Sequence, residues 1–115
     1  MAKMLVMVLS GKGNIQAEMV AFNFAINAVK NAHAEIEMLF LGQGVQIANK
    51  KQANSPQFKE QIENAIKMGI PVKACSVSLK NEGLTEQDIF PDVELVLGGV
   101  ETNLKIEEGY SVITF

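Results

Sequence analysis

The chain has no arginine: its ten basic residues are all lysines, and with 13 acidic residues the formal charge is −3. Without a guanidinium group, no side chain is suited to two-point binding of phosphate. The lysines form no basic run, so nothing indicates a surface for nucleic acid or for an anionic membrane. We therefore expect neither of these partners.

Long apolar segments are also missing. The run "MLVMVL" near the start has six residues, far fewer than the ~20 that span a bilayer. It is also short for the core of a signal peptide, and no small-residue cleavage site follows. We expect a cytoplasmic protein.

Cysteine and histidine occur once each, as Cys75 and His33. A single cysteine cannot form an internal disulfide, which agrees with a reducing compartment. The two residues together cannot supply the three or four ligands of a zinc site within one chain. We expect no metal site and no cofactor.

What the sequence does contain is an alternation of strand-like and helix-like segments over residues 1–115, which predicts a single domain. The predicted fold is a three-layer α/β/α domain with a doubly wound, mostly parallel five-stranded sheet. The strands are expected at 3–9, 34–42, 70–75, 93–99 and 110–115, and the helices at 14–31, 45–51, 55–69, 76–83 and 101–109.

The first predicted helix carries more apolar surface than one sheet face needs. Ile15, Met19 and Phe22 recur at helical spacing and predict the buried strip. Val20 and Phe24 form a second strip, and a monomer rarely exposes such a patch. This pattern predicts a homo-oligomer.

In a fold of this kind the ligand lies outside the carboxyl ends of the strands. The four strand exits, "SGKGN", "GQG", "CSVS" and "GGVETN", consist largely of small or hydroxyl residues, so backbone amides can approach a ligand closely. Any one glycine is explained as well by the turn itself. The candidate ligand-binding residues are Ser10, Gly42, Gly44, Ser76, Ser78, Gly98 and Gly99.

Cys75 is the candidate reactive residue. A lone cysteine is more often an inert buried residue, but this one lies between a predicted strand and a predicted helix. A helix N-terminus favours the thiolate, and Lys73 and Lys80 are near in sequence. No second cysteine or histidine is close enough in sequence for dithiol or protease-like chemistry. Glu101 on the last exit could touch a ligand or cap the following helix.

The segments "LGQGV", "GIPVKACSVSLKNEGL" and "LVLGGVETNLKIEEGY" resemble the DsrE/DsrF-like proteins, which include TusD-type subunits of sulfur relays and YchN-like proteins. The resemblance implies a doubly wound fold, trimers or hexamers, and sulfur donor and acceptor proteins as partners. It also implies that Cys75 accepts sulfur and holds it as a persulfide. The chain is shorter than the relay subunits between its second and third strands, so the relay partners stay open.

The first interpretation is a small sulfur carrier, in which Cys75 takes sulfane sulfur from a donor and passes it on, as a sulfurtransferase does. The alternative is a non-enzymatic, oligomeric protein of the same fold that binds a small ligand at the strand exits. A nucleotide-binding module would rest on scattered glycines alone, since neither "GKG" nor "GQG" is a phosphate-binding motif. Reactivity of the thiol distinguishes the first two.

Overall fold

The computed structural model describes residues 1–11 and 13–115; Lys12, in the "SGKGN" exit, lies outside the described residues. The described chain forms one sheet in which all neighbouring strands are parallel, in the order β4-β3-β2-β1-β5. The strands are β1 (Lys3–Val8), β2 (Glu35–Phe40), β3 (Val72–Cys75), β4 (Glu94–Val96) and β5 (Ser111–Thr114).

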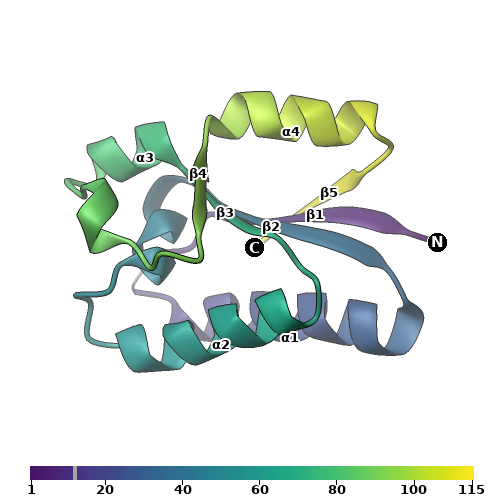
Figure 1. The fold of residues 1–115 in the computed structure, drawn as a ribbon, viewed down its shortest axis with the longest axis horizontal. Coiled ribbons are helices and arrows are strands. Elements are labelled where there is room, and N and C mark those ends of the chain that lie inside the picture. The colour runs from purple at the N-terminus through teal and green to yellow at the C-terminus, as the bar shows by residue number, and fades with distance from the viewer. Residues whose placement is uncertain (12) are drawn as a thin grey trace.

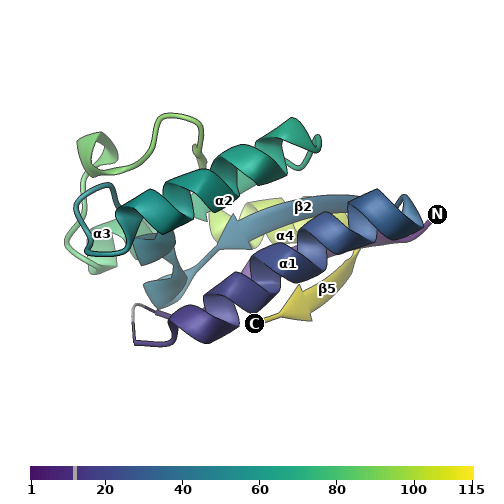
Figure 2. The same cartoon turned by 90° about the horizontal axis from the view of Figure 1, so that it is seen from below.

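Helices cover both faces of this sheet (Figure 1). Figure 2 shows α1 and α2 side by side on one face, while α3 and α4 lie on the other. The predicted three-layer fold is confirmed, with a sheet that is wholly parallel. The helices are α1 (Ile15–Ala32), α2 (Ser55–Lys67), α3 (Ser76–Asn81) and α4 (Gly98–Glu107), with short 3-10 helices η1 (Gly42–Ala48) and η2 (Glu86–Asp88).

Local signals explain most of the helix ends. The Asn14 side chain accepts a hydrogen bond from the Ala17 N–H at 3.2 Å and caps α1. Pro56 stands in the first turn of α2, where its missing N–H costs nothing. After α2 the chain turns at Gly69, whose φ of +83° suits glycine.

Two helix starts differ from the prediction. The segment expected to be helical from residue 45 is the 3-10 helix η1, which begins at Gly42. The last helix, α4, begins at Gly98 and not at Glu101, because β4 ends at Val96 and the glycine pair enters the helix directly. Both changes bring glycine residues of the predicted strand exits into helices.

The main apolar core lies between the sheet and α1 and α2. Val6, Met38 and Phe40 from the sheet are fully buried there. They pack with the large side chains of the two helices, and the rings of Phe22 and Phe40 meet edge-on with centroids 6.0 Å apart. Burial of large apolar side chains is the main source of stability in a small domain.

The face under α4 is different. The buried residues of α4 are Gly98 and Glu101, and no large apolar side chain of this helix is buried. Val100 and Leu104 on the helix are exposed, and so is Leu97, the residue before it. On the sheet beneath the helix, charged side chains of β2 and β3 lie beside the buried Leu5 and Leu39.

Candidate functional site

The site predicted for such a fold lies where the helices that follow the strands change from one face to the other. The helices after β1 and β2 are on one face, and those after β3 and β4 are on the other (Figure 1). The change therefore occurs between the carboxyl ends of β2 and β3. Cys75 is the last residue of β3 and the N-cap of α3, so it stands at this point.

The sulfur of Cys75 accepts several hydrogen bonds. Burial by itself raises the pKa of the thiol, but the N–H and hydroxyl of Ser78 and the N–H groups of Gly98 and Val77 donate to the sulfur. These bonds outweigh the effect of burial and hold the pKa of Cys75 below its ordinary value. The donors come from the first turns of α3 and α4, so the two helices together favour the thiolate.

Ser78 links the thiol to the exit of β2. Its Oγ accepts a hydrogen bond from the Gly42 N–H at 2.8 Å. This bond leaves the hydroxyl hydrogen free to point to the sulfur of Cys75. Gly42 has a φ of +57°, a conformation that other residues adopt with strain.

Gly98 lies against the thiol on the other side. A Cβ at this position would be 3.2 Å from the Cys75 Sγ and 2.5 Å from Cδ1 of Leu41. Only glycine fits such a gap without moving its neighbours. Leu41 was not predicted as a site residue, since an apolar residue at the end of a strand gives no signal of its own.

The other predicted residues are not in contact with the sulfur. Gly44 is packed against the Val8 carbonyl, so its missing side chain serves the packing of η1. Gly99 has open space where a Cβ would be. Ser76 lines a cavity of about 390 Å³ with Lys80 and five further residues of α3, β4 and the segment between them. Ser10 is half-buried at the exit of β1.

The thiol is less accessible than its position at a strand exit suggests. A reactive cysteine is expected to be reachable from solvent, but Cys75 is only 6% exposed. Gly98 at the start of α4 lies against it, and the sequence gives no indication that this helix begins so close.

The lysines near Cys75 in sequence have other partners. Lys73 Nζ lies 2.8 Å from Oε2 of Glu101 and 3.1 Å from Oε1 of Glu37. Lys80 forms no ion pair within residues 1–11 and 13–115. Glu101, which was expected to cap a helix or to touch a ligand, is instead buried against Lys73.

A fourth residue completes this buried network. Lys105 Nζ lies 3.4 Å from Oε1 of Glu37, so Glu37, Lys73, Glu101 and Lys105 form one charged cluster between the sheet and α4. Burial raises the pKa of Glu37 to about 7, and the neighbouring Glu101 carboxyl adds to the rise. The pKa of Glu101 is lowered, chiefly by its hydrogen bond with Glu37. The alternating "AEIEM" segment carried the signal for a charged sheet face, but not its partners.

Within the described ranges, no group of three or more His, Cys, Asp or Glu side chains is arranged to hold a metal ion. None of the described helices is both long and apolar enough to cross a membrane.

Known structures share this fold over the whole chain. The structure of the ychN protein from E. coli superposes with a TM-score of 0.81 at 14% identity, and covers 100% of both chains. The protein of unknown function BT1422 from Bacteroides thetaiotaomicron gives 0.74 at 18% identity, over 98% of this chain and 94% of its own. At these identities the likeness concerns the fold alone.

Sequence comparison defines the family. The uncharacterized protein MJ0989 of Methanocaldococcus jannaschii is 32% identical over 97 residues, which cover 83% of each chain. The uncharacterized protein MK0008 of Methanopyrus kandleri is 34% identical over 77 residues, which cover 65% of this chain and 63% of that protein. The sequence model of the DsrE/DsrF-like family matches residues 2–115. The chain is therefore a member of the DsrE/DsrF-like family.

Proposed function

We propose that this protein is a small cytoplasmic sulfur carrier that holds sulfane sulfur as a persulfide on Cys75. The observation that carries the proposal is the set of donors around the sulfur, namely the N–H groups of Val77, Ser78 and Gly98 and the Ser78 hydroxyl. Such a set stabilises a negative charge on sulfur, and the thiolate is the nucleophilic form of cysteine. Membership of a family associated with sulfur relay supports the same conclusion.

The chemistry requires no base and no external oxidant. The Cys75 thiolate attacks the terminal sulfur of a persulfide or polysulfide donor, a new S–S bond forms, and the S–S bond of the donor breaks. The donor leaves as a thiolate that is one sulfur shorter. In the second step an acceptor thiolate attacks the outer sulfur of the Cys75 persulfide and releases the Cys75 thiolate.

Intact mass measured after exposure to polysulfide tests this proposal. The wild-type chain should gain the mass of one sulfur atom, and a second thiol should remove it again. Cys75→Ser is the matched control because the chain has no other cysteine. A wild-type chain that gains no more sulfur than the control would contradict the proposal.

The burial of Cys75 favours a second candidate function. The thiol is only 6% exposed, and the cavity of about 390 Å³ beside Ser76 has the volume of a small-ligand site. A non-enzymatic binding protein of the same fold would gain no sulfur in this experiment. The mass measurement therefore separates the two candidates.

Assembly into a homo-oligomer, such as a trimer or hexamer, is part of the proposal. Val20 and Phe24 on α1 are 48% and 37% exposed in the single chain, so the second apolar strip does face outward. We expect another copy to cover it. Light scattering at micromolar concentration should give a multiple of the chain mass, and a clean monomer would contradict this part.

A further inference from the structure

The proposed function does not explain what holds Gly98 in position beside the sulfur of Cys75. Its N–H must stay on the Cys75 sulfur, and the gap between Leu41 and Sγ leaves no room for a side chain. Gly98 therefore has no side chain that could hold it in place. Its position depends on the way in which the rest of α4 is fixed on the sheet.

Leu5 and Leu39 of the sheet are buried on this face, but the large apolar side chains of α4 itself contribute little to its attachment. Leu97, Val100 and Leu104, which would be the natural anchors of a short helix, are 56%, 56% and 45% exposed. Glu101 is the one residue of α4 besides Gly98 that is buried, and it lies one turn after Gly98. The first turn of this helix is thus anchored by a carboxylate.

The partner of that carboxylate is on the strand that carries the thiol. Lys73 Nζ is 2.8 Å from Glu101 Oε2, and Lys73 and Cys75 are two residues apart on β3, so both face the layer of α4. The side chains are nearly buried, with 15% of Lys73 and 11% of Glu101 exposed. An ion pair in such a setting has a defined geometry and tolerates little displacement.

We propose that Glu101 is a positioning residue for Cys75: its ion pair with Lys73 holds the first turn of α4 so that the Gly98 N–H stays on the sulfur. The inference rests on the proposed role of Cys75 as a thiolate. Glu101 does not touch the sulfur in this account, and it acts through Gly98.

The direction in which Glu101→Ala shifts the pKa of Cys75 distinguishes positioning from a direct electrostatic effect. Removal of a nearby negative charge stabilises a thiolate, so by charge alone Glu101→Ala should lower the pKa of Cys75. Loss of the Gly98 hydrogen bond destabilises the thiolate and should raise it. We predict a rise of about one pH unit, which is a tenfold loss of thiolate well below the midpoint.

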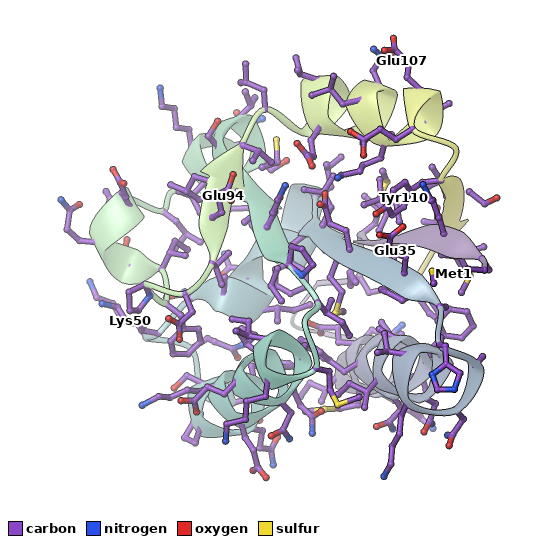
Figure 3. The ribbon with its side chains drawn as sticks, turned by 45° about the vertical axis from the view of Figure 1, so that its right-hand side comes forward. Met1, Glu35, Lys50, Glu94, Glu107 and Tyr110 are labelled. Atoms are coloured by element: carbon purple, nitrogen blue, oxygen red, sulfur yellow. The ribbon has the colours of Figure 1, made fainter. Side chains whose placement is uncertain are left out.

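The measurement is an NMR titration of the Cys75 Cβ after labelling with ¹³C-cysteine. The single cysteine gives a single signal, and its midpoint reports ionisation whether or not the thiol is accessible. Glu107→Ala is the matched control, because Glu107 lies on the same helix, is exposed and points away from the sheet (Figure 3). This control should leave the midpoint unchanged.

A double variant tests whether geometry or charge is responsible. Lys73→Met/Glu101→Met removes both charges together and leaves the Glu37–Lys105 pair in place. Because apolar side chains of similar length can replace a buried ion pair, the double variant should return the midpoint most of the way to the wild-type value. If Glu101→Ala does not fold, Glu101→Gln gives the same test with a smaller expected rise.

The possible results separate the inference from the function on which it rests. A wild-type midpoint in the ordinary cysteine range overturns the proposed function and the inference with it. A low wild-type midpoint that falls or stays unchanged in the Glu101 variants overturns the inference alone. A rise in these variants without recovery in the double variant also overturns it.

Discussion

The two faces of the sheet are held by different forces. Under α1 and α2, the contacts are made mainly by fully buried apolar side chains such as Phe22, Phe40 and Phe58. Under α4, two lysines and two glutamates form ion pairs beside the buried side chains of Leu5 and Leu39. Apolar contacts are numerous and without direction, whereas ion pairs are few, directional and dependent on pH.

The end of the molecule that carries Cys75 lies on the face held by ion pairs. The sulfur of Cys75 is outside the main apolar cluster, and its donors are the first residues of α3 and α4. The face around the thiol therefore depends on ion pairs, whereas the opposite face is held mainly by apolar contacts. The following predictions, from the largest expected effect to the smallest, test this contrast.

Truncation in the apolar layer should have the largest effect. Phe22→Ala removes a fully buried ring that meets Phe40, and should lower the free energy of unfolding by about 3–5 kcal/mol. Leu104→Ala on the outer side of α4 should change it by no more than about 0.5 kcal/mol. Urea unfolding measures both. Equal losses would show that the two faces do not differ in this way.

Breaking the charged layer should come next. Lys73→Met leaves the buried carboxyls of Glu37 and Glu101 with Lys105 as their remaining lysine in the network. We expect a loss of about 3 kcal/mol, mostly the cost of an uncompensated buried charge. The double variant Lys73→Met/Glu101→Met should regain more than half of it. A single variant as stable as the wild type would mean that the network contributes nothing to the attachment of α4.

The pH dependence of stability provides the third test. Glu18 on α1 is fully buried, neither of its carboxyl oxygens has a hydrogen-bond partner in the described part of the chain, and burial raises its pKa from 4.5 to about 7. Burial likewise raises the pKa of Glu37 to about 7. The folded state therefore binds more protons than the unfolded state over this window. The free energy of unfolding should fall as the pH rises from about 4.5 through about 7, and level off above that.

A single variant isolates the contribution of Glu18. Glu18→Gln keeps the shape of the side chain but cannot ionise, so it should raise the free energy of unfolding by about 2 kcal/mol near pH ~8. At about pH 5, where the folded protein holds the carboxyl neutral, it should change little. Urea unfolding at both pH values measures the difference. A variant that is less stable than the wild type near pH ~8 would reveal a partner for the carboxylate.

The smallest effect is expected at the thiol itself. Cys75→Ser replaces the sulfur by an oxygen that the same N–H groups can reach, so the loss in unfolding free energy should be about 1 kcal/mol or less. Urea unfolding of the wild type and of Cys75→Ser measures this loss. A loss on the order of 3 kcal/mol would place Cys75 with the core residues and not with the site.

The sequence predicted the layers of the fold better than the contacts of the site. Helical spacing in residues 14–31 and the strand–Cys–helix unit at residue 75 were sufficient for the alternation and for the place of the thiol. The start of α4 was missed because a glycine pair has low helix propensity. Gly98 occupies that position because it lies against the sulfur.

The partners of Lys73 could not be derived from sequence for a related reason. Lys73 is close to Cys75 along the chain, which suggested a charge near the sulfur, but the ion pairs of Lys73 join β3 to β2 and α4. Such pairs depend on strand order and on the side of the sheet that α4 covers. The burial of Cys75 has the same origin, since it results from a helix that comes later in the chain.

We have argued that backbone and hydroxyl donors on α3 and α4 hold the pKa of Cys75 below its ordinary value despite its burial. The pH titration of the ¹³C-labelled Cys75 Cβ in the wild-type protein tests it most directly. We predict a titration midpoint for Cys75 clearly below the ordinary value of ~8.5. A midpoint at or above ~8.5 would mean that burial outweighs the donors, and it would contradict the claim.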